Sequence, residues 1–515
     1  MQRKQLTLVI VSLLVVVLSV SLAWFTTQII GKGKDVSVTS TNLQIVFTDT
    51  DGEIAGADIE PGWQKTKTFT VENNSKSEYK YNIVIKDLLN TFVTNGYLQY
   101  KITSTNGGYN MTEFKDIPKS STPKDKILAY SVVIPNGVTQ SYTIEFKYAN
   151  DESVDQSDDM GKKLSGTLFI TEGTEDIYAG YEEGTLGYQI MGDNPTRSTR
   201  SNNNNGTNDF ATPLTTTTTG TLFKSTESIT GITDSPKEVY YYAGNTTNNW
   251  VKFAGFYWRI IRTNHDSSIR LLYVGTSHDT TTGNIGTSAF NSSYYSPKYA
   301  GYKYGEDTSL DTIRNNTTDS TIKTFIDSWY KNNLTNYTKY LSTSAVYCND
   351  RSEGTGQTYS VSADFNFASY YRMDWIGDGA KANPSYNCTD IRDAFSVDNT
   401  SAKLTYPVSL MTADEIAFAG GVAFRTMNTP YAWFISNSVG TQVSTYWWSL
   451  SPSAWNVGRA SVWSWNSDVA YLYSLYVVNT NAVRPAISLK SCIKYSTGNG
   501  TSESPYEIVE TSSGC

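Results

Sequence analysis

The chain has 515 residues, of which 39% are hydrophobic and 17% charged, with 37 tyrosines and a formal net charge of −8. This length exceeds what one hydrophobic core organises, so more than one domain is expected. The aromatic content excludes an intrinsically disordered chain, and the lack of a concentrated basic face excludes nucleic acid as a partner.

An apolar stretch opens the chain. Residues 6–23 carry no charge and follow Arg3 and Lys4. Such a segment approaches the length of a bilayer span and keeps its positive charge on the cytoplasmic side. The triplet at 21–23 also fits a small-x-small cleavage site. Residues 1–30 are therefore expected to be a transmembrane anchor or a signal peptide. The rest of the chain would lie outside the cell, attached by a single membrane pass or secreted if the leader is cleaved.

Residues 36–173 alternate polar and apolar side chains in short runs separated by turn signals. The runs lie at 43–47, 67–71, 81–85, 141–146 and 165–170, and the turns include Pro61-Gly62 and Asn136-Gly137. Alternation of this kind is typical of strands with one face on a core. Several such strands without a long helical pattern predict an antiparallel β-sandwich, so the chain is expected to be mainly β.

Four short motifs in this region carry a resemblance. They are 59–62 (IEPG), 68–74 (TFTVENN), 134–137 (IPNG) and 165–170 (SGTLFI). In this order they resemble the camelysin and biofilm-fibre family of Gram-positive bacteria. The resemblance implies a secreted Ig-like or jelly-roll sandwich that follows an apolar leader. It also implies a stalk or assembly unit, although a generic spacer sandwich is an equally good interpretation.

Residues 174–235 change in character. Asn202 to Asn205 are four consecutive asparagines, Thr215 to Thr219 are five consecutive threonines, and Pro195 and Pro213 interrupt regular elements. Such polar, low-complexity sequence cannot bury enough apolar surface to fold alone. A linker is predicted here, with short ordered pieces near 186–190.

Residues 236–515 mix strand and helix patterns, which predicts an α+β domain. Strand-like runs at 250–262 and 269–274 flank a turn at 263–268. Apolar residues at helical spacing predict a helix within 320–340, and a second helix is predicted at 411–419. The second helix has Thr412 as N-cap, Glu415 in a capping box and a stop at Gly420-Gly421. Strand-like runs follow at 447–450, 461–465, 471–478 and 483–489.

The four cysteines all lie in this C-terminal half: Cys348, Cys388, Cys492 and Cys515. Outside the membrane an even set predicts disulfides, and three pairings are possible. Nearest-neighbour pairing, Cys348 with Cys388 and Cys492 with Cys515, is favoured because each bridge would close a local segment rich in turn residues. A zinc site is the rival, but the sequence has no C-x-x-C and only two His. We therefore expect no metal.

A second resemblance spans this half. Its motifs are 255–262 (GFYWRIIR), 411–420 (MTADEIAFAG), 447–452 (WWSLSP) and 483–489 (VRPAISL). Together they resemble a C-type-lectin-like domain of bacterial surface proteins related to formylglycine-generating-enzyme folds. The resemblance implies the fold. It does not imply the enzyme's activity, because these cysteines fit structural bridges and one fold hosts many functions.

Residues suited to catalysis are few. His265 and His278 lie in polar turns outside any motif, so no hydrolytic triad is expected. Asp414 and Glu415 are adjacent at a helix start, where capping and solvation explain them better than a glycosidase pair. The segment 465–468 (WNSD) departs from the calcium-dependent sugar motif of C-type lectins by one inserted Ser. We therefore expect neither an enzyme nor a cofactor.

The segment 453–476 is the most informative for function. It combines rigid aromatic side chains with polar ones, which is the composition that binding surfaces use. The predicted ligand-binding residues are Trp455, Asn456, Arg459, Ser461, Trp463, Trp465, Asn466, Asp468, Tyr471, Tyr473 and Tyr476. Within 461–465, alternation places Ser461, Trp463 and Trp465 on one face of a strand. Trp463 could equally belong to the core.

The position of this segment adds a further resemblance. In variable proteins of diversity-generating retroelements, a lectin-like fold displays its diversified residues just before the closing strand. The flanks 447–452 and 483–489 resemble that layout. We therefore expect a cell-surface protein that binds an extracellular protein or glycan through a C-type-lectin-like head. The alternative is a structural subunit of a surface fibre or biofilm matrix.

Overall fold

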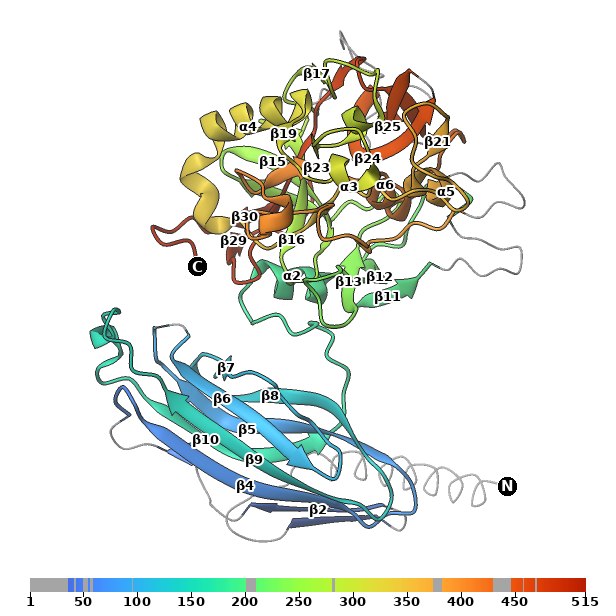
Figure 1. Ribbon diagram of the computed structural model, residues 1–515. Coiled ribbons are helices and arrows are strands. Elements are labelled where there is room, and N and C mark those ends of the chain that lie inside the picture. Colours follow the sequence, from blue (N-terminus) through green and yellow to red (C-terminus); the bar gives the residue numbers. More distant parts are fainter. Residues whose placement is uncertain are drawn as a thin grey trace, which may run out of the picture. The chain divides into compact units, whose positions relative to one another are not determined.

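The computed structural model describes most of the chain after residue 35 (Figure 1). The described ranges are 36–40, 43–49, 54–55, 59–94, 96–200, 210–279, 283–373, 382–428, 446–456, 458–467 and 470–515. The predicted anchor or signal at 1–30 lies outside them. A search of these ranges finds no helix that is long and apolar enough to cross a membrane. The chain divides into two compact units, unit 1 up to Asp176 and unit 2 from Ile177.

Unit 1 is built from two antiparallel sheets. The strand order of one is β1 (Val36–Ser40), β2 (Leu43–Asp49), β4 (Gln64–Asn73), β9 (Thr139–Tyr148), β6 (Leu98–Thr105) and β7 (Lys115–Asp116). That of the other is β3 (Ile54–Ala55), β10 (Leu164–Glu172), β5 (Tyr79–Asn90) and β8 (Ser120–Ile134). A 3₁₀ turn, η1 (Ser157–Asp159), precedes β10.

One core lies between these sheets. Every second residue of β9 is buried, so Ile144 and Phe146 pack in the same cluster as Ile83 and Ile85 of β5. The predicted strands at 43–47, 67–71, 81–85, 141–146 and 165–170 all fall within observed strands. Period-two alternation identified these strands, although β5 buries all of 81–85 and places Val84 in a second small cluster with Phe169.

Unit 2 contains a large mixed sheet. Its path is β11 (Thr196–Thr199), β12 (Thr221–Glu227), β13 (Lys237–Tyr241), β15 (Phe256–Thr263), β14 (Trp250–Phe253), β30 (Tyr506–Ile508) and β29 (Tyr495–Thr497). Off this path, β16 (Ile269–Gly275) joins β15 to β28 (Pro485–Leu489), and β23 (Val408–Leu410) pairs with β28. β15, β16 and β28 are almost entirely buried, so the sheet is covered on both faces there.

A second sheet of unit 2 carries the segment singled out above. Its order is β17 (Thr287–Ala289), β27 (Thr480–Ala482), β24 (Tyr446–Asn456), β25 (Arg459–Asn466) and β26 (Tyr471–Tyr476), and β21 (Phe365–Asn366) also pairs with β24. Two short ladders join β18 (Lys303–Tyr304) to β19 (Thr318–Asp319) and β20 (Tyr347–Cys348) to β22 (Ala394–Phe395). The chain is thus mainly β, with several sheets.

The helices of unit 2 are short. They are α2 (Leu186–Asp193), α3 (Leu310–Ile313), α4 (Thr321–Asn333), α5 (Ala368–Met373) and α6 (Ala413–Ala419), with 3₁₀ turns η2 (Pro297–Ala300), η3 (Thr335–Tyr340) and η4 (Thr400–Ala402). The helix predicted within 320–340 is α4, capped by Ser320, and the rest of that range is mostly η3. The capping box of Thr412 and Glu415 on α6 is confirmed, and Gly420 ends that helix at φ 119°.

Two predictions from composition differ from the structure. The run 250–262 is a hairpin of β14 and β15, because Ala254 and Gly255 have φ of 55° and 76° and reverse the chain. Much of the range 174–235, predicted to be a linker, belongs to unit 2. There α2 buries Leu186 and Ile190 in the main core, and β11 pairs in parallel with β12. Contacts with residues distant in sequence stabilise this polar segment, and composition alone does not reveal such contacts. The four asparagines lie outside the described residues.

Two disulfides close local segments of unit 2. Cys348 is bonded to Cys388 and Cys492 to Cys515, which confirms the predicted pairing. The first bond joins Cys348 of β20 to a segment beside Ile229, and both cysteines pack in a small apolar cluster there. The second ties the C-terminal residue to the segment after β28.

Candidate functional site

The predicted ligand-binding residues divide into a buried group and an exposed group. Trp455, Ser461, Trp463, Trp465 and Asn466 are all at least nine-tenths buried. Val462, on the opposite face of β25, is buried too, so both faces of this strand are covered. The interpretation of Trp455, Ser461, Trp465 and Asn466 as an exposed surface is wrong, and of the two interpretations left open for Trp463 the core is the one observed.

The aromatic packing explains their burial. The Trp463 ring stacks on Tyr370 of α5 with centroids 5.6 Å apart and lies 5.5 Å from Phe424. Trp465 packs so closely against Gly421 that a Cβ there would lie 2.7 Å from its ring. Trp455 pairs across the sheet with Phe365 of β21. Alternation predicted one buried face, but helix α5 and the segment after α6 cover the other.

The rest of the predicted set is accessible. Asn456 and Arg459 are exposed, Tyr471 is half-buried, and Tyr473 and Tyr476 are 36% and 37% exposed. Tyr473 borders Phe424 and Tyr471, with ring centroids 5.7 Å and 6.0 Å away. Asp468 lies outside the described residues.

Arg459, Tyr476, Tyr294 and Tyr295 form what we call the Arg459 cluster. Arg459 Nη1 donates to the Tyr476 hydroxyl at 3.1 Å, and the guanidinium lies 5.0 Å from the centre of that ring. The amide of Ala460 donates to the carbonyl of Tyr294 at 2.9 Å, which holds the loop before η2 against β25. The cluster therefore unites the β25–β26 hairpin with a loop distant in sequence.

The two loop tyrosines present an aromatic face to solvent. Their ring centroids are 4.3 Å apart, and the Tyr294 hydroxyl donates to that of Tyr295 at 3.1 Å. Tyr295 is 71% exposed. The hydrogen bond to Tyr295 raises the pKa of Tyr294, and that to Tyr476 raises the pKa of Arg459. The Tyr294 phenol thus stays neutral and the guanidinium charged at physiological pH.

Arg459 differs in its partners from four other arginines of unit 2. Arg262, Arg270, Arg351 and Arg372 each form an ion pair with a carboxylate, whereas no described carboxylate lies within 4.0 Å of the Arg459 guanidinium. A guanidinium has five N–H donors, and Tyr476 uses one of them. The cluster can therefore offer a planar cationic group together with aromatic faces.

Sequence reasoning missed Tyr294 and Tyr295. Their signal was a Tyr-Tyr pair between serines and followed by Pro297, a turn composition in which large aromatics are unlikely to be core. Aromatic density distinguishes the segment 453–476 in the sequence, whereas the contact of this loop with β25 is visible only in the structure.

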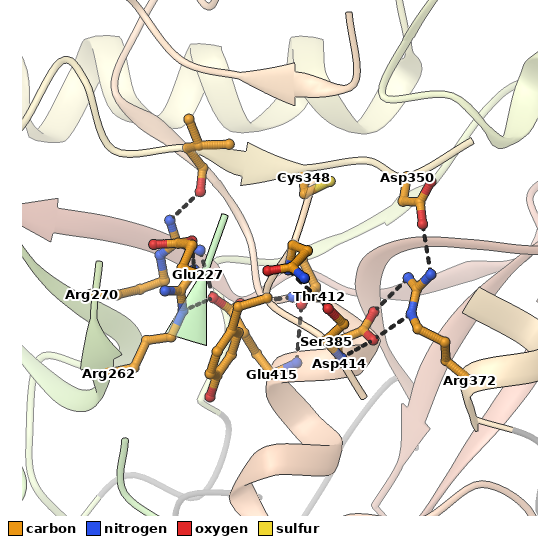
Figure 2. A pocket seen from close by; sticks show the side chains of 13 residues that line it. Glu227, Arg262, Arg270, Cys348, Asp350, Arg372, Ser385, Thr412, Asp414 and Glu415 are labelled. Carbon is orange, nitrogen blue, oxygen red and sulfur yellow. Dashed lines mark hydrogen bonds and ion pairs between the residues drawn. The ribbon is translucent and has the colours of Figure 1, made fainter. Parts of the chain in front are cut away.

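A pocket elsewhere in unit 2 contains a dense group of ionised residues (Figure 2). Its empty space is about 320 Å³, solvent at the mouth included, and carboxylates and arginines dominate its lining. Arg262 donates to Glu227 and to Glu415 at 2.8 Å each, and Arg270 reaches the same oxygen of Glu415 at 2.5 Å. On the other side, Arg372 bridges Asp350 and Asp414 at 2.7 Å each (Figure 2).

These charges satisfy one another. Burial alone would raise the pKa of Glu227, but the charge of Arg262 and hydrogen bonds from His265 and Arg262 outweigh burial and hold it well below its usual range. Arg270 and Arg262 lower the pKa of Glu415 in the same way. The second oxygen of Glu415 accepts the Thr412 amide at 2.9 Å. With its charges paired in this way, the group is best explained as a structural network.

Two interpretations of these residues require correction. Asp414 and Glu415 were expected to be solvated, but both are buried and ion-paired, although Glu415 does form the predicted cap. The His265 side chain is 7% exposed and lies 3.4 Å from Glu227, so it is not a solvated turn residue. His278 is more open, with 32% of its side chain exposed. An adjacent acidic pair after an N-cap can thus form ion pairs on opposite sides of a pocket, Asp414 with Arg372 and Glu415 with Arg262 and Arg270.

The network predicts acid sensitivity. The pKa values of Glu227, Glu415 and Asp350 lie below their ordinary values in the folded chain. Their contribution to stability is therefore complete above the unfolded pKa values of about 4 and is lost as pH falls through the folded ones. Urea unfolding should give a nearly constant free energy from pH 7 to about 5.5 and a progressive fall below about pH 4.5. A constant value down to pH 3 would contradict this assignment.

Across the described ranges, no three His, Cys, Asp or Glu side chains are grouped so that they could hold a metal ion.

Comparison with protein-family models, with curated proteins and with solved structures found no match for this chain. Function is therefore inferred from the site alone.

Proposed function

We propose that unit 2 is the binding head of a cell-surface protein and that the Arg459 cluster is the centre of its binding surface. The observation that carries this proposal is the accessible set of one arginine and three tyrosines on one loop and one hairpin. Tyrosine and arginine dominate binding hot spots because they supply rigid contact area and directed hydrogen bonds at low entropic cost. Tyr471 and Tyr473 extend the aromatic surface along β26.

The proposal also covers the fold of each unit and the cellular location of the protein. We assign unit 1 to an Ig-like or jelly-roll sandwich, supported by two antiparallel sheets around one core. We assign unit 2 to a C-type-lectin-like domain, supported by the motifs at 447–452 and 483–489 on β24 and β28. The uncharged stretch 6–23 and the two disulfides support an extracellular location, anchored or secreted. Both disulfides lie in a domain to which we assign no catalytic role.

The retroelement resemblance is part of the same proposal, restricted to accessible positions. Diversified residues would be those that contact a ligand, so Arg459, Tyr473 and Tyr476 are candidates and the buried tryptophans are not. Sequencing the neighbouring DNA tests this. A reverse transcriptase gene with a near-copy of the segment 447–490, differing at the accessible codons, is expected. Differences concentrated at the tryptophan codons would contradict the assignment.

Attachment assays test the binding proposal. The full-length chain should bind to a target in a panel of host and bacterial cell surfaces. The double variants Tyr294→Phe/Tyr295→Ala, which keeps the Tyr294 ring that packs against the core, and Arg459→Ala/Tyr476→Ala should reduce that binding at least tenfold. Their melting temperatures should hardly change, because surface substitutions usually alter stability by within about 0.5 kcal/mol.

The matched control is Ile232→Ala. Ile232 is 37% exposed, as Tyr476 is. It lies in the turn after β12, which belongs to the large sheet of unit 2 and not to the sheet that contains β25 and β26. This variant should bind as the unmodified chain does. Undiminished binding by both double variants would refute the proposed site, and equal losses in the control would show that the effect is not specific to the cluster.

A further inference from the structure

The Arg459 cluster has the composition of a site for one acidic sugar residue. Resting on the proposed function, we propose that it binds a carbohydrate that carries a carboxylate, with the acid on Arg459 and the sugar ring against the tyrosines. The inference depends on the chemistry of three groups: the guanidinium, the exposed ring face and the phenol hydroxyls.

The guanidinium supplies the selectivity for acid. It is exposed, and its hydrogen bond to Tyr476 at 3.1 Å fixes the head group while leaving other donors of the fork directed elsewhere. Two parallel N–H donors match the two oxygens of a carboxylate. No described carboxylate occupies them within 4.0 Å. A carboxylate of a ligand could therefore bind the Arg459 guanidinium without first displacing a carboxylate of the described chain.

The tyrosine pair supplies the surface for the ring. Tyr295 is 71% exposed and leans on Tyr294, with ring centroids 4.3 Å apart and a hydroxyl–hydroxyl bond at 3.1 Å. These contacts hold an aromatic face in place before a ligand arrives, which lowers the entropic cost of binding. A sugar ring has an apolar C–H face that fits an aromatic plane, and its hydroxyls can form hydrogen bonds with the tyrosine hydroxyls.

Charge favours a single acid group over an extended acidic partner. The chain has a formal net charge of −8, which repels a polyanionic peptide over its length. One carboxylate placed on Arg459 needs only the local cation, because charges beyond about 8–10 Å are screened at physiological salt. An acidic peptide is therefore the disfavoured occupant and serves as an arm of the test.

Calorimetric titration of the full-length chain tests the inference with matched probes. These are 3′-sialyllactose against lactose, methyl glucuronide against methyl glucoside, and an acidic peptide. At least one acidic sugar should bind tenfold or more tightly than its neutral parent and more tightly than the peptide. Arg459→Gln should abolish the preference for the acid, and Tyr295→Ala should weaken binding at least fivefold. Lys252→Gln removes another exposed cation and should leave binding unchanged.

Equal or undetectable binding of each acidic sugar and its parent would overturn the inference, as would tighter binding of the peptide or an intact preference in Arg459→Gln. These failures are distinguishable from failure of the proposed function. If attachment to cell surfaces still depends on the cluster while no acidic sugar binds, the binding head stands and only the ligand class is wrong.

Discussion

Replacing Trp463 with Ala is expected to lower the free energy of unfolding of unit 2 by about 3–5 kcal/mol. The side chain is fully buried and packs against Tyr370 and Phe424. Its indole nitrogen has no hydrogen-bond partner among the described residues, so the loss comes from packing and the cavity left behind. Urea unfolding followed by far-UV circular dichroism measures it.

Two further variants make this prediction specific. Trp463→Phe keeps most of the ring volume and has no N–H to satisfy, so it should cost clearly less than Ala. Tyr295→Ala removes an aromatic of which 71% is exposed and should stay within about 0.5 kcal/mol of the unmodified chain. If Trp463→Ala were equally mild, Trp463 would not be part of the core.

The second large effect concerns the ionised pocket. Glu415→Gln should destabilise unit 2 by about 3–5 kcal/mol, because Arg262 and Arg270 both donate to the same buried carboxylate oxygen. The amide keeps the size of the side chain but not the charge that compensates the two guanidiniums. Equilibrium urea unfolding at pH 7 gives the difference.

The matched control is Glu507→Gln. Glu507 pairs with Lys252 at 2.9 Å, but both side chains are nearly half exposed, so loss of this pair should cost about 0–1 kcal/mol. A similar cost for the two variants would mean that burial does not strengthen the dependence on charge in the pocket. A mild effect of Glu415→Gln would refute the assignment of the pocket as a structural network.

Much of the fold could be predicted from local patterns. In unit 1 every second residue of β9 is buried, and alternation located this strand and its neighbours directly. The capping box on α6 and both disulfide pairs were likewise predictable, because they depend on residues that are close in sequence or few in number. The ordered piece predicted near 186–190 is confirmed as α2, but the linker prediction was wrong where β11 pairs with β12, a partner distant in sequence.

The site was less predictable for the same physical reason. Sequence composition identified the hairpin of β25 and β26, but it did not separate Trp463 and Trp465 from Arg459 and Tyr476. That separation depends on α5 and the segment after α6. These two segments cover the face of β25 that alternation predicted to be exposed. Tyr294 and Tyr295 were missed because their contact with β25 joins residues far apart in the chain.

Hydroxyl-radical footprinting of the full-length chain, free and attached to its target surface, tests the central claim most directly. It requires no substitution and therefore leaves the fold intact. Tyr295 and Tyr476 are solvent-exposed in the free chain, and attachment should protect them and Arg459 while leaving Ile232 and Tyr371 reactive. Protection confined to residues outside the Arg459 cluster, with Tyr295 and Tyr476 as reactive as before, would contradict the account.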